Sequence, residues 1–205
     1  NILMLGSAFI SIFVLWGSVT DPVNVTKLLA LGGVAGAAVA IVISFGLSKL
    51  WAAHKVVLIL LLIFLATVIN SVIQSAAPMY QLIYGAYGRN TGLVTYLLLS
   101  LLFVSAASLS NKNSFLKISY GLLAAGVINA IYSLWVTLFG DFIGWTNPYG
   151  NILGTFGNPN FVGAFLGIFV SVLFAYLLKP DLSLPFRITT VLVLLVSFFE
   201  IKESH

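Results

Sequence analysis

Residues 56–73 of the chain read VVLILLLIFLATVINSVI, an apolar run without a charged residue. A helix needs about 20 mostly apolar residues to cross the hydrocarbon core of a bilayer. The run is continuously apolar rather than alternating, which favours a helix over a strand of a membrane barrel. It therefore predicts a membrane-spanning α-helix.

The composition of the whole chain agrees with this prediction. Of its 205 residues, 60% are hydrophobic and only 7% are charged, whereas a soluble domain carries roughly 25% charged residues. Most soluble enzymes, secreted disulfide scaffolds and disordered tails are thereby excluded. The nine Lys and Arg residues form no basic cluster, so we expect no nucleic-acid partner. The chain has no Cys, which excludes disulfides and thiolate chemistry.

Similar apolar runs, separated by short polar breaks, fill the rest of the chain. Six are expected to be complete spans and the seventh is shorter: Ile2–Val19, Leu28–Leu47, Val56–Ile73, Leu93–Leu109, Phe115–Phe139, Phe161–Leu178 and Ile188–Phe199. We therefore expect an all-α fold, a polytopic transmembrane helix bundle of about seven spans in one transmembrane domain over residues 1–205. The chain starts at Asn1 and its first run lacks the flanks of a signal peptide, so we expect the N-terminal part of a longer protein.

The positive charges predict the orientation of the bundle. The breaks after the second, fourth and sixth runs hold most of them, namely Lys49, Lys55, Lys112, Lys117, Lys179 and Arg187, whereas the other breaks hold Lys27 and Arg89. By the positive-inside rule the richer set lies in the cytoplasm, and so does the N-terminus. The two longest breaks, residues 74–92 and 140–160, then face outward.

The first outer loop carries a candidate anion site. Arg89 is its only charged residue, and it is flanked by Gly88 and followed by Asn90 and Thr91. Asn90 or Thr91 is expected to cap the next helix, leaving the free amides of that helix facing outward beside the guanidinium. Such a place suits a phosphate group. An Arg that anchors the span at the lipid headgroups is the alternative, and both interpretations stay open.

The second outer loop ends in the sequence Gly154-Thr-Phe-Gly-Asn-Pro-Asn-Phe161, immediately before an apolar run. Pro159 is tolerated in the first turn of a helix, and Asn158 or Asn160 is expected to cap that helix. The stretch is explained either by a turn and cap alone or by a second helix N-terminus aimed at an anion.

Aromatic residues are frequent in both outer loops: Tyr80, Tyr84, Tyr87, Trp145 and Tyr149. They fit an interfacial belt, and they equally fit flat platforms on which sugar rings stack.

Several further patterns are interpreted as structural. Gly32, Gly36 and Ala40 repeat at the four-residue spacing that lets helices pack closely. Asn70 and Asn129 are the most polar residues deep in the runs, and we expect them to form hydrogen bonds between helices. Asp21, which precedes Pro22, is more typical of a turn or cap than of a catalytic base.

The sequence lacks the residue sets that common catalytic and metal sites require. No Ser/His/Asp set, nucleotide loop or metal-ligand spacing is present, so neither a cofactor nor a metal is expected. No charged residue lies in the middle of an apolar run, which argues against an ion-coupled transporter.

Two stretches, Tyr87-Gly-Arg-Asn-Thr-Gly-Leu93 and Gly154-Thr-Phe-Gly-Asn-Pro-Asn-Phe161, resemble the O-antigen ligase and polymerase family. Its members are bacterial integral membrane proteins that handle undecaprenyl-pyrophosphate-linked glycans on the outer face of the membrane. The resemblance implies a multi-pass protein of the bacterial inner membrane that transfers a glycan from undecaprenyl pyrophosphate to an acceptor. Its partners would be the lipid bilayer and the lipid-linked glycan. Pyrophosphate or glycan would be bound by Tyr87, Arg89, Asn90, Asn158 and Asn160.

The resemblance also implies what residues 1–205 lack. Family members have about ten to twelve spans and a large outer loop with important Arg and His residues, well beyond the part matched here. They often place an Arg where this sequence has Asn151. We therefore expect the chain alone to be inactive, with its catalytic residues unidentified. The alternatives are a transporter or flippase for a lipid-linked or small apolar substrate, and a structural or assembly subunit.

The absence of Cys allows the orientation to be tested directly with single Cys substitutions at Arg89 and Asn158. Both positions are expected to react with a membrane-impermeant thiol reagent added from the extracytoplasmic side, because the charge distribution places both loops there. Labelling of both positions only from the cytoplasmic side would overturn the predicted orientation.

Overall fold

The structure is a computed structural model that describes residues 1–14, 21–109, 111–143, 147 and 150–203. Most of the described residues lie in helices, and none of them lies in a strand. The all-α prediction is therefore confirmed.

The described helices differ widely in length. They are α1 (Ile2–Ile12), α2 (Asn24–Phe45), α3 (Leu47–Gln74), α4 (Met79–Tyr84), α5 (Leu93–Ala107), α6 (Lys112–Phe139), the 3₁₀ turn η1 (Gly154–Phe156), α7 (Pro159–Leu177) and α8 (Leu184–Glu203). Five of them, α2, α3, α6, α7 and α8, are long and apolar enough to cross a membrane. The chain therefore has the helices of a membrane protein.

The lengths of three helices, α1, α5 and α8, depart from the predicted spans. The described part of the first run forms a helix of 11 residues, and α5 has 15 residues, fewer than a span of ordinary length needs. The seventh run was expected to be short, but α8 has 20 residues. The apolar run stops at Glu200, whereas helical hydrogen bonding continues past a charged side chain.

The connection between the second and third runs is much shorter than the predicted polar break. Only Gly46, with a φ of 94°, separates α2 from α3, and a glycine adopts this backbone conformation without strain. Lys49 and Lys55, expected in a loop, lie inside α3. A non-helical residue, His54 (φ −130°, ψ 28°), kinks α3 between them. A short basic segment thus precedes the long apolar part of α3.

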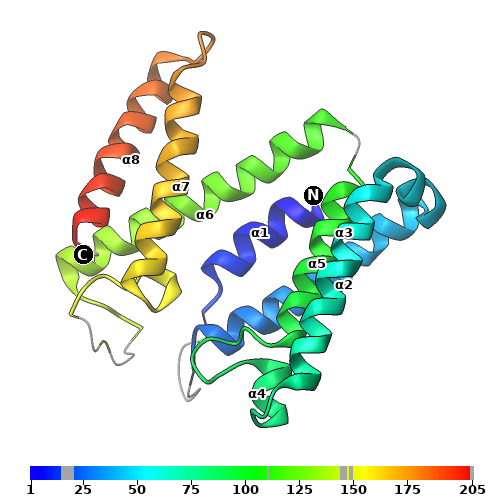
Figure 1. The fold of residues 1–205 in the computed structure, drawn as a ribbon. Helices are drawn as coiled ribbons and strands as arrows, with labels where there is room; N and C mark the ends of the chain where they lie inside the picture. The colour runs from blue at the N-terminus through cyan, green and yellow to red at the C-terminus, as the bar shows by residue number, and fades with distance from the viewer. Residues whose placement is uncertain (15–20, 110, 144–146, 148–149, 204–205) are drawn as a thin grey trace. The chain divides into compact units, whose positions relative to one another are not determined.

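The chain divides into two compact units, which are described separately. The first unit contains Asn1–Gly6 and Asn24–Ile118, and the second contains Ser7–Val23 and Ser119–His205. In the first unit, α2 packs on α3 and α5, and α4 packs on α5 (Figure 1). In the second unit, α7 and α8 run side by side as a helical hairpin, and η1 packs on α7.

Small residues bring α2 and α5 together, and the predicted stripe takes part only at Gly32, where a Cβ atom would lie 3.8 Å from a leucine side chain of α5. Ala35 and Ala38 of α2 are fully buried, and the Ser105 hydroxyl of α5 donates to the Ala38 carbonyl oxygen at 3.1 Å. Gly36 was predicted to line the packing face, but a side chain there would meet nothing within 4 Å. The prediction is wrong at Gly36, because the most buried residues of α2, Ala35 and Ala38, are offset by one or two positions from it around the helix.

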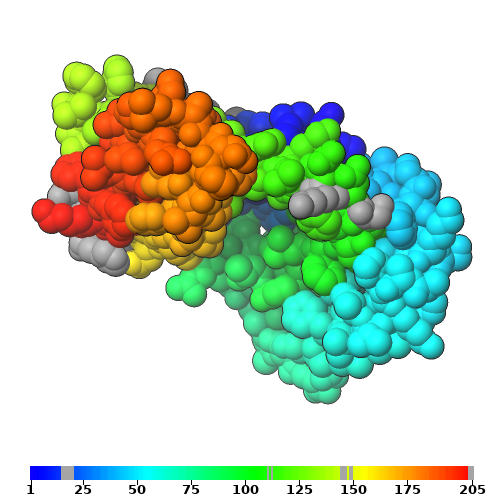
Figure 2. Space-filling view, turned by 90° about the horizontal axis from the view of Figure 1, so that it is seen from above, coloured from blue at the N-terminus to red at the C-terminus, as the bar shows by residue number. Residues whose placement is uncertain are grey.

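The long apolar helix α3 presents most of its surface outward. The apolar window of α3 that qualifies as a span contains no buried residue. Figure 2 shows this helix, in cyan, on the outside of its unit. An exposed apolar surface of this length suits contact with lipid tails.

The core of the second unit is built around α7. Its buried residues are Val162, Leu166, Phe169, Val170 and Leu173 of α7 with Leu194 of α8. Helix α6 reaches this core through Gly126, where a Cβ atom would lie 2.1 Å from the ring of Phe169. The absence of a side chain at Gly126 therefore sets how closely α6 approaches α7.

We predict that Gly126→Ala destabilises the protein by about 1–3 kcal/mol, because the added methyl group overpacks the buried Phe169 ring. Gly36→Ala is the matched control, since it also lies in a candidate span but has no neighbour within 4 Å. Unfolding of both variants in detergent micelles measures the difference. Equal stability of the two variants would contradict the close packing at Gly126.

Candidate substrate-binding groove

The first loop, residues 75–92, closes on itself through two glycines. Gly85 ends α4 with a φ of 94°, and Gly92 directly precedes α5. A Cβ atom on Gly92 would lie 2.4 Å from the Gly85 nitrogen, and one on Gly85 would lie 2.3 Å from the Thr91 nitrogen. Two backbone segments are therefore in contact at this point, which we term the Gly85–Gly92 neck. Only glycine fits at either position.

Beyond the neck the chain makes a compact turn. The Ala86 carbonyl oxygen accepts hydrogen bonds from the backbone nitrogens of Arg89, at 3.0 Å, and Asn90, at 3.2 Å. Gly88 (φ 79°) and Asn90 (φ 47°) adopt the left-handed conformation, which Gly and Asn tolerate best. The Thr95 hydroxyl donates to the Asn90 carbonyl oxygen and ties the turn to α5.

The predicted helix cap at Asn90 or Thr91 is wrong. Helix α5 starts after Gly92, and no side chain caps it. Asn90 is instead used for the left-handed turn, where its carbonyl group is bound by Thr95. None of the described residues accepts a hydrogen bond from the backbone nitrogens of Leu93 and Val94, so the start of α5 still presents amide donors, as expected.

Arg89 lies exposed at the tip of this turn. None of the described residues forms a hydrogen bond or ion pair with its guanidinium group. Residues 74–92 contain no Asp or Glu that would neutralise it. The Tyr87 side chain, two residues earlier, is 76% exposed. The turn therefore presents one uncompensated positive charge and one aromatic ring.

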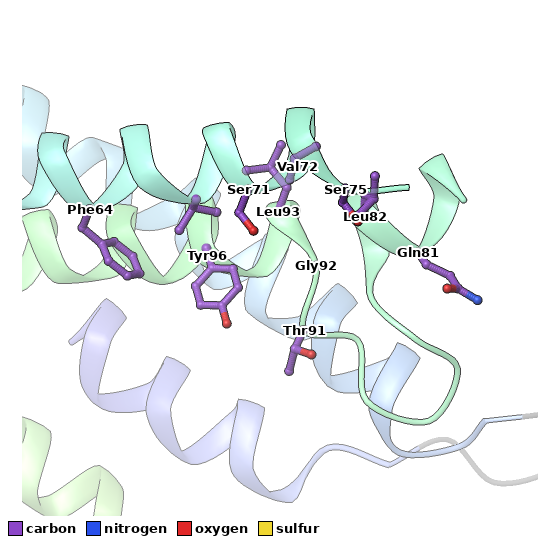
Figure 3. Close-up of a pocket in the computed structure, with 11 residues that line it drawn as sticks. Phe64, Ser71, Val72, Ser75, Gln81, Leu82, Thr91, Gly92, Leu93 and Tyr96 are labelled. Carbon is purple, nitrogen blue, oxygen red and sulfur yellow. The ribbon is translucent and has the colours of Figure 1, made fainter. Parts of the chain in front are cut away.

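A groove of about 300 Å³ lies where α3, α4 and the start of α5 meet. Figure 3 shows Phe64 and Tyr96 at one end of it, with ring centroids 6.0 Å apart, and Gln81 at the other. The lining also includes polar side chains and parts of the neck: Ser71, Ser75, Thr91 and Gly92. Arg89 does not line the groove, but its neighbours Thr91 and Gly92 do. The groove therefore joins an aromatic, apolar end to polar groups next to the Arg89 turn.

The stretch Gly154–Phe161, which we term the second motif, contains the predicted helix cap. Asn158 is the N-cap of α7, and its side-chain oxygen accepts from the Asn160 backbone nitrogen at 2.9 Å. Pro159 occupies the first turn, as expected. Asn160 is not the cap, and it is exposed. Gly157 adopts a left-handed conformation (φ 66°), and a Cβ atom there would lie 2.8 Å from the Val23 side chain.

A buried asparagine holds the second motif in place. Asn129 of α6 is fully buried, and its side-chain oxygen accepts from the Thr155 backbone nitrogen at 3.1 Å. The Thr155 hydroxyl lies 2.8 Å from the same oxygen and 2.8 Å from the Ser11 carbonyl oxygen. The predicted helix–helix hydrogen bond of Asn129 is therefore present, and its partner is the short 3₁₀ helix η1 rather than a helix of membrane-spanning length. The turn and the cap are therefore held by side-chain hydrogen bonds and contribute to the fold of the second unit.

The structure groups the predicted site residues into two sets. Tyr87, Arg89 and Asn90 share one turn of the first unit, whereas Asn158 and Asn160 share one helix cap of the second unit. Sequence reasoning missed the groove and the neck, although the glycine spacing in the first loop was a usable signal. The aromatic residues Trp145 and Tyr149 lie outside the described residues.

Asp21 forms a turn, as expected. Its carboxylate oxygen accepts from the Val23 backbone nitrogen at 3.1 Å, and the residue is buried.

No family model, curated protein or solved structure matches the chain. The geometry of the two motifs therefore carries the functional argument.

We predict that Asn129→Ala destabilises the protein by about 1–2 kcal/mol, because the buried backbone nitrogen of Thr155 loses its acceptor. Asn70→Ala serves as the control, since Asn70 lies exposed on α3. The two variants are compared by thermal unfolding in the same detergent. Asn129→Ala behaving like Asn70→Ala would show that the second motif does not depend on this hydrogen bond.

Proposed function

We propose that the protein is an O-antigen ligase-like or polymerase-like protein of the bacterial inner membrane. It transfers a glycan from undecaprenyl pyrophosphate to an acceptor on the extracytoplasmic face. The observation that carries this proposal is the exposed Arg89 guanidinium, held on a closed turn whose neck lines an aromatic groove. A polyprenyl pyrophosphate has an anionic head and an apolar tail, and it requires both features together.

The head group is assigned to the Arg89 turn. A guanidinium group binds phosphate oxygens in a bidentate manner, and near the membrane it is desolvated more easily than an ammonium group. The amide donors of Leu93 and Val94 at the start of α5 add partial positive charge. Tyr87 and Asn90 belong to the same turn and would contact the pyrophosphate or the first sugar.

The tail is assigned to the groove and the adjoining surface of α3. Phe64 and Tyr96 supply aromatic surface, and Val68 and Leu93 supply aliphatic surface. Burial of apolar area contributes roughly 25 cal/mol per Å², so even partial occupation of a 300 Å³ groove would assist binding. The exposed apolar side of α3 would continue this path along the bilayer.

The second motif is assigned to the glycan side. Asn160 is exposed at the start of α7, where its amide group is able to donate and accept hydrogen bonds. Asn158 would act mainly by fixing this turn. Transfer also needs a base for the acceptor hydroxyl, for which residues 1–205 offer no clear candidate. We therefore propose that residues 1–205 bind the donor without completing transfer.

A transporter or flippase of a lipid-linked substrate is the second candidate function. One observation favours it: Glu200 lies fully buried inside the candidate span of α8. Ionisable groups inside membranes often mark the path of a transported ion or substrate.

We predict that Arg89→Ala in the full-length protein lowers glycan transfer from undecaprenyl pyrophosphate by about 10- to 100-fold, the effect of losing a charged hydrogen bond. Arg89→Lys should recover only part of the activity, because an ammonium group does not reproduce bidentate contact. Transfer is measured in membranes at matched protein levels. Arg187→Ala, which removes an exposed Arg from the start of α8, should retain activity.

Two outcomes contradict this proposal at different levels. Full activity of Arg89→Lys, with little loss in Arg89→Ala, would assign Arg89 to headgroup anchoring instead. No glycan transfer by the unaltered full-length protein would reject the enzymatic function itself.

A further inference from the structure

The buried face of α8 is polar, which is unusual for a helix of this hydrophobicity. Four buried residues follow each other at spacings of three and four positions: Thr190, Leu194, Ser197 and Glu200. The Thr190 and Ser197 hydroxyls donate to the carbonyl oxygens of Phe186, at 2.8 Å, and Val193, at 2.9 Å, so their own helix satisfies them. Glu200 is the exception on this face.

The Glu200 carboxyl group is buried without a partner. Its residue is 0% exposed, and neither of its two side-chain oxygens has a hydrogen-bond partner. The backbone of Leu134 in α6 is the one polar group of the described residues that interacts with it, and this interaction is weaker than an ordinary hydrogen bond. The hydroxyl of Ser133, the residue before Leu134, is also buried in a residue that is 0% exposed, and it is likewise unpartnered. The chain itself therefore covers this carboxyl group.

No described cation compensates Glu200. Lys202 follows on the exposed side of α8, and Arg187 lies 13 residues earlier on the helix, about 20 Å away along its axis. The Tyr132 hydroxyl of α6 donates its hydrogen bond to Asp141, at 2.7 Å, and not to Glu200. The titratable group of α7 is Tyr176, near the end at which α8 begins.

An ionised carboxylate in such a place costs several kcal/mol of desolvation, which the Leu134 backbone offsets only in part. A metal ion does not resolve this, because hard cations require several oxygen ligands. Among the described residues, no group of three His, Asp or Glu residues comes together. A proton is the one cation that needs no further ligands.

We propose that Glu200 is a proton-binding site inside the second unit, occupied when α8 is packed as in this structure. The carboxyl group then carries its proton, and it releases the proton only when α8 separates from α6 far enough to admit water. Proton binding and the packing of α8 are therefore linked, so that a rise in pH favours the separated state. This inference is independent of Arg89 and of the proposed glycan transfer.

Labelling with a hydrophobic carbodiimide, which reacts with protonated carboxyl groups in apolar surroundings, tests the proposal in native membranes. Peptide mapping should find Glu200 modified at about pH 6 about tenfold more than Asp181, whose side chain is exposed to water rather than held in apolar surroundings. Modification of Glu200 should fall several-fold as the pH is raised to about 9. Glu200→Gln should abolish the signal at this position.

The pH dependence of stability supplies a second readout. A Glu200 side chain that only fills space would not produce such a dependence. Because the packed state holds the protonated form and the unfolded state does not, the unfolding temperature of the unaltered protein should fall as the pH rises. Glu200→Gln, which is neutral and of similar size, should remove that dependence, whereas Asp181→Asn should retain it. Absence of Glu200 labelling at every pH, or equal pH dependence in Glu200→Gln, would overturn the proposal.

Discussion

Backbone polar groups that leave water must find partners within the protein, and this requirement shapes the second unit. Most of the chain meets it by forming helices. The segment around η1 is buried but not α-helical, so its amides need other acceptors. The Asn129 side chain supplies one from α6, and the Asn158 side chain supplies another at the start of α7. The position of α7 therefore depends on two asparagine side chains.

The first loop meets the same requirement in a different way. It is exposed over most of its length, and its turn satisfies its own amides through the Ala86 carbonyl group. The Gly85–Gly92 neck joins the ends of the turn, so the helices on both sides are fixed while the tip remains open. This division explains how Arg89 is held on an ordered backbone and yet has no described partner. A charge presented in this way is available to an external anion.

Sequence reasoning was most successful where one local force decides the structure. Continuous hydropathy predicted the helices, and the Asn-Pro-Asn stretch predicted the cap at Asn158, because both depend on neighbours in the chain. It failed where a residue has two possible uses, as with Asn90, which forms a left-handed turn rather than a cap. It also failed at Gly36, because the rotation of α2 against α5 depends on side chains far away in sequence. The span number, the orientation and the ligand of the Arg89 turn stay predictions.

The neck of the first loop also bears on how such a protein can change. Because Gly85 and Gly92 are in contact, the ends of the segment between them stay in place whichever residues the segment contains. Substitutions, and even changes of length, between these glycines would alter the groups that the turn exposes without shifting α4 or α5. Selection is thus free to diversify the tip while the membrane anchoring remains constant. Loop grafting between related proteins has a natural cut point at these two glycines.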